Sequence, residues 1–202
     1  MSRLRIVFVA ALAAFFTSAA TAQPVPQSAM PQSSVKSIEP QEVTLAPQKV
    51  VYISGHADFD DVYNALVTSL RELRAYLDKE GIAPTGPAMA RYTDGGENGF
   101  EFEVAYPVAE TPKNPPQGDI AAGDVPGGKA LDFVHRGSFN KIDETYSAID
   151  DYFRERGKPS AGGPEADEEH DVLADSFEQY TTDPLTTDPN QVEVHIIVPV
   201  KQ

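Results

Sequence analysis

The segment Phe177-Glu178-Gln179-Tyr180 places a carboxylate among aromatic residues near the end of the chain. If this segment is a β-strand, alternation puts Glu178 and Tyr180 on the same face. A pocket on that face would remove water from the carboxylate, which raises its pKa, whereas a cationic ligand would favour its ionised form. The same carboxylate can act as general base toward a bound water. The alternative is an ordinary strand glutamate that faces solvent.

Further aromatic residues have positions from which they can wall such a pocket and stack on a flat or cationic molecule. They are Tyr92, Tyr106, Phe139, Tyr146, Phe177 and Tyr180. Tyr146 also lies on an apolar helical stripe with Phe153, so packing in the core is the alternative for this residue.

Acidic and imidazole side chains occupy the polar positions of two similar alternating segments, FEFEVAYPV at 100–108 and VEVHIIVPV at 192–200. Glu103 and His195 are equivalent when the two segments are aligned. With Glu193 they can deepen a negative cleft or form an acid–base pair. The alternative is a solvated face of a sheet.

The chain offers no clear metal or cofactor motif. None of its four histidines has the spacing of a zinc motif such as HExxH. The acidic run at 167–171 lacks the EF-hand pattern and is typical of a solvated loop. There is no cysteine, no phosphate-binding glycine loop and no GxSxG motif. We therefore expect no metal and no cofactor.

A strand–helix–strand–strand pattern that occurs twice would position these residues. Lys49 and Phe59 recur eighty positions later as Lys129 and Phe139, and each copy ends in one of the two alternating segments. The sequence therefore predicts an α+β fold of two tandem repeats, 42–108 and 118–202.

The elements of each copy follow from hydrophobic periodicity. The first copy is expected to hold a strand at 49–54, a helix from 62 to the glycine at 81, and strands at 88–92 and 100–106. The second is expected to hold strands at 120–125 and 130–135, a helix over 142–153, and strands at 172–180 and 192–200. Gly127-Gly128 predicts a hairpin turn. Each helix must bury its apolar stripe on a small antiparallel sheet, and we expect a cleft between the repeats.

Residues 1–22 have the features of a secretory signal peptide: two arginines, a short apolar run and the small-residue site Ala20-Thr21-Ala22. Residues 23–41 are rich in Pro, Gln and Ser, which is typical of a disordered tether before the domain at 42–202. These features predict a periplasmic or secreted bacterial protein, with no membrane association after cleavage.

The net charge of the chain indicates which kinds of partner to expect. It is −15 for the whole chain, and removal of residues 1–22 takes away two arginines and no acid, leaving −17. Without a basic stripe, nucleic acid is not an expected partner. An acidic surface concentrates cations, including cationic small molecules, although it can also serve solubility alone.

The chain resembles the GyrI-like small-molecule-binding domain, also known as the effector-binding domain of AraC-type regulators. The resemblance rests on HRGSF at 135–139, Tyr146 in the following helix, FEQYTTDP at 177–184 and the terminal IVPV. It implies tandem strand–helix–strand–strand repeats and a cleft for amphipathic, often cationic, aromatic molecules, with Glu178 as the buried counter-charge. The family often has Tyr where this chain has Phe139, and the signal peptide argues against a regulator of transcription.

Three functions follow as alternatives. The first is an exported binding protein that captures an amphipathic small molecule in the cleft, through Glu178, the aromatic walls and His195. The second, implied by stand-alone relatives that resemble hydrolases of strained cyclopropane-bearing toxins, is an enzyme in which Glu178 positions water. The third is a protein-interaction module, which predicts a filled cleft and an exposed apolar patch.

Overall fold

The computed structural model describes residues 38–96, 99–112, 118–158 and 175–200. The expected signal peptide, most of the expected tether and the acidic run at 167–171 lie outside these ranges. Among the described helices, none is long and apolar enough to cross a membrane. Within the same ranges, no three His, Asp or Glu side chains are grouped so that they could hold a metal ion.

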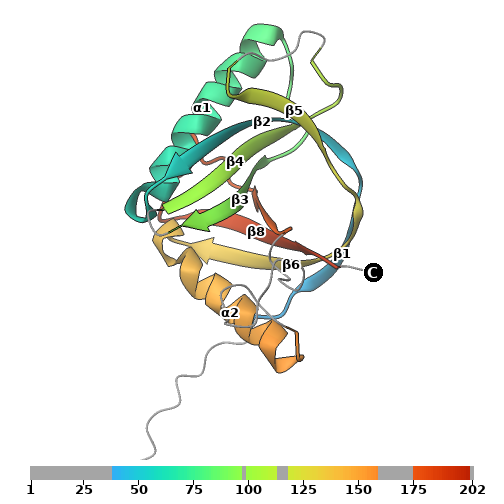
Figure 1. Ribbon diagram of the computed structural model, residues 1–202, viewed down its shortest axis with the longest axis vertical. Helices are drawn as coiled ribbons and strands as arrows, with labels where there is room; N and C mark the ends of the chain where they lie inside the picture. Colours follow the sequence, from blue (N-terminus) through green and yellow to red (C-terminus); the bar gives the residue numbers. More distant parts are fainter. Residues whose placement is uncertain (1–37, 97–98, 113–117, 159–174, 201–202) are drawn as a thin grey trace, which may run out of the picture. The chain divides into compact units, whose positions relative to one another are not determined.

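Strands and helices follow each other in the same order in both halves of the described chain (Figure 1). The first half comprises β1 (Gln41–Leu45), β2 (Gln48–Ala57), the 3-10 turn η1 (Phe59–Asp61), α1 (Val62–Glu80), β3 (Ala88–Gly96) and β4 (Gly99–Val108). The second half comprises β5 (Ile120–Val125), β6 (Gly128–Gly137), the 3-10 turn η2 (Phe139–Lys141), α2 (Ile142–Glu155), β7 (Phe177–Tyr180) and β8 (Val192–Pro199). The predicted α+β class is confirmed.

The strands form a single antiparallel sheet in the order β1-β6-β8-β7-β3-β4-β2-β5. The two sheets expected from the sequence are therefore continuous, joined where Ala90 of β3 pairs with Glu178 of β7. The hairpin predicted at Gly127-Gly128 is wrong, because β5 pairs with β2 and β6 pairs with β1. Each half lends its first strand to the other half, so neither half has a complete sheet of its own.

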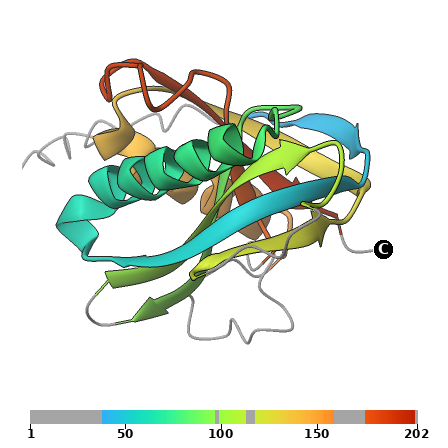
Figure 2. The same ribbon diagram turned by 90° about the horizontal axis from the view of Figure 1, so that it is seen from above.

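Both helices cover one face of this sheet, which we call the helical face. Helix α1 packs on β2 and β4 (Figure 2), and α2 packs on β6 (Figure 1). The buried stripe of α1 consists of Leu66, Leu70, Leu73 and Leu77. The helix ends at Gly81, whose φ of 68° lies in the left-handed region that favours glycine.

Alternation along the strands decides which side chains meet the helices. In β8, Val192, Val194 and Ile196 are buried in the main core, whereas Glu193 and His195 between them face the other way. A smaller apolar cluster of Val50, Met89 and Ala105 lies on that second face, which we call the opposite face. The sheet therefore separates two environments that share the same strands.

His135 ties β6 to the start of α2 and so helps to place Tyr146. Its ring is 5% exposed, and its Nε2 lies 3.1 Å from the carbonyl oxygen of Ser138. Because a carbonyl only accepts, Nε2 carries a proton and donates it to this oxygen, and Nδ1 lies 2.8 Å from the Thr145 hydroxyl oxygen.

We expect His135→Phe to lower the free energy of unfolding by about 1–3 kcal/mol, because both partners lose their hydrogen bonds in a buried site. Urea denaturation measures the change. His56→Phe, at a half-exposed ring on β2, is the matched control and is expected to change stability by less than about 0.5 kcal/mol. Equal losses in the two variants would contradict this role for His135.

Candidate functional site

Strand β7 presents Glu178 and Tyr180 to the helical face and Phe177 and Gln179 to the opposite face. Glu178 has no exposed surface and Tyr180 is 2% exposed, whereas Phe177 and Gln179 are half-buried. Such alternation is what a four-residue strand with core on one side dictates. Glu178 is thus a carboxylate at the centre of the sheet, under the helices.

Three tyrosine hydroxyls donate to this carboxylate, each from a different element. Tyr146 of α2 donates to Oε1 at 2.9 Å, and Tyr180 of β7 donates to Oε2. Tyr92 of β3 also forms a side-chain hydrogen bond to Glu178. We call Glu178 with Tyr92, Tyr146 and Tyr180 the tyrosine cage.

The carboxylate has no cationic partner within the described ranges. Burial therefore raises the pKa of Glu178 to about 7, even though the three hydroxyls, which stabilise the ionised form, act in the other direction. Desolvation is the larger effect because neutral donors do not replace the full hydration of a charge. Near neutral pH the site holds either a proton or an uncompensated negative charge.

The tyrosines keep their protons as donors. Burial, and next to it the negative charge of Glu178, raises the pKa of Tyr92, Tyr146 and Tyr180 well above the usual range. Their hydroxyl ends are deep, yet Tyr92 and Tyr146 keep partial exposure as whole residues. These two rings therefore lie between the carboxylate and solvent.

The expectation that Glu178 lines an open cleft is not met in this structure, since the cage covers it. A small hollow of about 170 Å³ lies next to Tyr180, with Tyr106 and Arg74 in its wall. Tyr106 therefore shares this hollow with Tyr180, whose hydroxyl donates to Glu178. Phe139 packs against Tyr63 with ring centroids 4.7 Å apart and is buried in the core.

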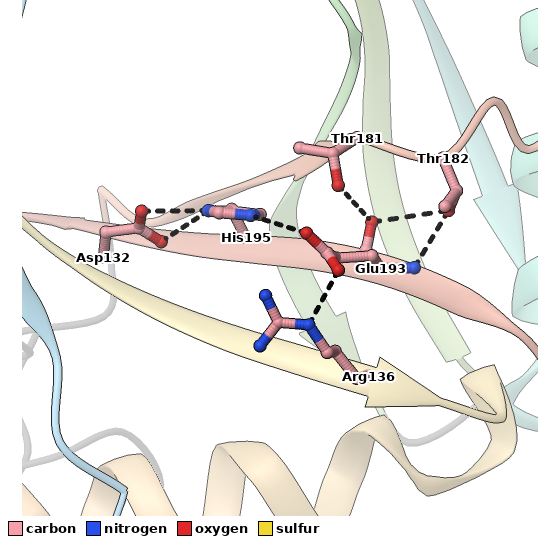
Figure 3. Close-up of polar contacts among 6 residues, drawn as sticks. All are labelled: Asp132, Arg136, Thr181, Thr182, Glu193 and His195. Atoms are coloured by element: carbon pink, nitrogen blue, oxygen red, sulfur yellow. Dashed lines mark hydrogen bonds and ion pairs between the residues drawn. The ribbon is translucent and has the colours of Figure 1, made fainter.

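His195 lies on the face of the sheet opposite to Glu178. There it belongs to a chain of polar contacts with Asp132, Glu193 and Arg136 (Figure 3). Its Nδ1 is 2.9 Å from both carboxylate oxygens of Asp132, and its Nε2 is 3.4 Å from Glu193 Oε1. Arg136 Nε donates to Glu193 Oε2 at 2.7 Å. Hydrogen bonds from Arg136 and then His195 lower the pKa of Glu193.

Two carboxylates of the opposite face, those of Glu103 and Glu193, are compensated by arginines, in contrast to Glu178. Glu103 accepts from Arg91 Nε at 2.7 Å, as Glu193 does from Arg136. The predicted negative cleft of Glu103, Glu193 and His195 does not form a single site with the tyrosine cage, because the sheet lies between them. Each carboxylate already has a cationic partner from a neighbouring strand.

Sequence patterns did not indicate Asp132 and Arg136 as members of a polar site. They alternate with buried Phe133 and His135 on β6, so strand alternation places them on the face of His195. Alternation alone did not show that β6 and β8 are paired in the register that sets Arg136 opposite Glu193.

Comparison with known proteins identifies the class. A family model described as the GyrI-like small molecule binding domain matches residues 38–201, which is most of the chain. The protein belongs to this GyrI-like family of small-molecule-binding domains. No curated protein matches it significantly.

Solved structures show the same fold at low sequence identity. The EcmrR chain in a DNA complex superimposes with a TM-score of 0.64 at 15% identity, covering 82% of this chain and 58% of that one. The EcmrR C-terminal domain superimposes with a TM-score of 0.56 at 16% identity, covering 82% of this chain and 98% of that one. A hydrolase from Listeria innocua superimposes with a TM-score of 0.52 at 11% identity, covering 81% of this chain and 92% of that one. The chain therefore matches a little over half of the full EcmrR chain and nearly all of its C-terminal domain.

Proposed function

We propose that the protein is an exported binder that captures a cationic, amphipathic small molecule on the helical face, with Glu178 as counter-charge. The observation that carries the proposal is a fully buried carboxylate with three neutral donors and no cation within the described ranges. A buried charge without a partner is unfavourable for the folded protein. A ligand that brings a positive charge removes that penalty on binding.

Entry requires the cage to open. Tyr146 and Tyr92 are the partly exposed members, so rotation of their rings would uncover the carboxylate and leave aromatic faces for the bound cation. The hollow of about 170 Å³ beside Tyr106 and Tyr180 adds space next to the cage, for a small part of a ligand. Membership of a small-molecule-binding family supports the capture of a ligand in general.

Glu178→Gln tests the proposal at pH 8, where the wild-type carboxylate is ionised. Calorimetric titration with the monocationic dye thioflavin T is expected to show an affinity at least about tenfold weaker in the variant, equivalent to about 1.4 kcal/mol. Glu103→Gln, which also removes one acid, is the control for the general attraction of cations to an acidic protein. An equal loss in both variants, or none in Glu178→Gln, contradicts the proposal.

A pKa of about 7 also suits a group that transfers protons at neutral pH, which keeps hydrolysis as a second candidate. Incubation with a cyclopropane-bearing electrophile would then give a product heavier by one water, and Glu178→Gln would abolish it. For the third alternative, a protein-interaction module, Val200 is the one large hydrophobic residue that is exposed on the described surface.

A further inference from the structure

A hollow of about 660 Å³ lies on the opposite face of the sheet and is not used by the proposed function. Its lining includes Leu45 at the end of β1 and Pro126 and Gly127 between β5 and β6. The connections from β1 to β2 and from β5 to β6 lie side by side at this place (Figure 1). A Cβ on Gly127 would lie 2.6 Å from Pro47 and 2.7 Å from the carbonyl oxygen of Leu45, so the two connections touch at a position that only glycine fits. The exchange of β1 and β5 thus folds both edges of the sheet around this face.

The floor of the hollow is apolar and comes from both halves of the chain. Val50, Met89 and Ala105 form a buried cluster there, with Phe177 packed against it. Its size lies within the roughly 300–1,000 Å³ typical of sites for drug-sized molecules. Phe177 and Glu178 are adjacent on β7, so one strand separates the hollow from the tyrosine cage.

Three of the five charged side chains in the wall, Arg91, Glu103 and Asp124, have a partner of opposite charge, and this sets the class of ligand. Arg91 donates to Glu103 at 2.7 Å, and Asp124 lies 3.5 Å from Lys49. The remaining charged residues of the lining are Lys129 and Asp175, which are exposed and opposite in sign. In contrast to Glu178, the hollow offers no buried charge that a ligand would have to compensate.

We infer that this hollow is a second binding site, distinct from the tyrosine cage, for an uncharged and largely apolar small molecule. The ligand would cover Met89, Ala105 and Phe177 and gain affinity by removing apolar surface from water. A charged molecule would have to give up hydration without a buried counter-charge in return. The two faces of the sheet therefore select ligands of different charge.

Two variants and an uncharged fluorescent probe, N-phenyl-1-naphthylamine, test this inference. Ala105→Trp fills the hollow, and Met89→Gln places an amide in its floor at nearly the same length. Both are expected to weaken binding of the probe, at least about tenfold for Ala105→Trp and about threefold for Met89→Gln. Ala75→Trp, on the exposed side of α1, is the matched control and is expected to bind the probe as the wild type does.

The outcomes separate this site from the cage. Glu178→Gln is expected to leave the affinity for the naphthylamine within about twofold, and Ala105→Trp to leave that for thioflavin T within about twofold. Circular dichroism melting curves confirm that each variant is folded; if Ala105→Trp is not, Met89→Gln decides alone. Unchanged naphthylamine binding in the folded hollow variants, or a loss in Glu178→Gln instead, overturns the inference. Failure of thioflavin T to depend on Glu178 overturns only the proposed function.

Discussion

Glu178→Gln is expected to raise the free energy of unfolding at pH 8 and to remove a pH dependence that the wild type shows between about pH 4.5 and pH 7. Burial raises the pKa of Glu178 from 4.5 to about 7 in the folded protein. Between these values the folded state holds a proton that the unfolded state has lost, so wild-type stability falls as pH rises. Above pH 7 the loss is complete, because both states are then ionised.

The size of this effect follows from the shift. Each pKa unit corresponds to about 1.4 kcal/mol, so the loss across the window is about 3 kcal/mol. The amide introduced by Glu178→Gln would resemble the protonated acid in shape and charge. The variant is therefore expected to match the wild type near pH 4.5 and to exceed it by up to about 3 kcal/mol at pH 8.

Urea denaturation at half-unit steps from pH 4.5 to pH 8 measures the two profiles. Many other acids titrate in this chain, so the informative quantity is the difference between wild type and variant, and Glu103→Gln shows what the loss of a compensated acid does. A difference that is constant with pH, or that grows toward acid pH, would mean that Glu178 is not an uncompensated buried acid.

Cation binding is expected to follow the same titration in the opposite sense, with affinity rising as pH increases through 7. Only the ionised carboxylate attracts a cation, and below the pKa a ligand must first displace the proton. The apparent dissociation constant of thioflavin T is therefore expected to rise about tenfold for each pH unit below 7. Between pH 8 and pH 5 the wild type would lose up to about 100-fold in affinity.

The glutamine variant sets the lower limit of this titration. At acid pH the wild-type affinity is expected to level off at the value of Glu178→Gln, which itself varies little with pH. Calorimetry in buffers of different ionisation enthalpy adds an independent reading, since binding at pH 6 would release about one proton per dye bound. Binding that is independent of pH, or without proton release, would show that the dye does not meet this carboxylate.

The expected pH profiles of stability and of cation affinity have the same physical origin. The penalty that an ionised Glu178 imposes on the empty protein at pH 8 is the free energy that a cation recovers when it binds. A protein that keeps a counter-charge buried without a partner is therefore less stable when empty and more stabilised by its ligand. The tyrosine donors reduce this penalty without removing it.

Local patterns in the sequence were sufficient for both helices, for most strands and for the direction of their side chains, although strand β1 was not predicted. The spacing of Leu66, Leu70, Leu73 and Leu77 predicts the buried stripe of α1, and alternation in FEQY puts Glu178 and Tyr180 on one face. Both depend on helix and strand geometry, which acts over a few residues. The family resemblance, carried by short motifs in a fixed order, is confirmed as well.

The tertiary structure alone decided what those faces meet. Exchange of β1 and β5, the pairing of β3 with β7 and the closure of the hollow at Gly127 depend on contacts between residues far apart in the chain. The same long-range pairing brings Tyr92 and Tyr146 to Glu178 and puts His195 on the other side of the sheet. Periodicity records which side of an element is apolar, and it contains no information about which distant element will cover that side.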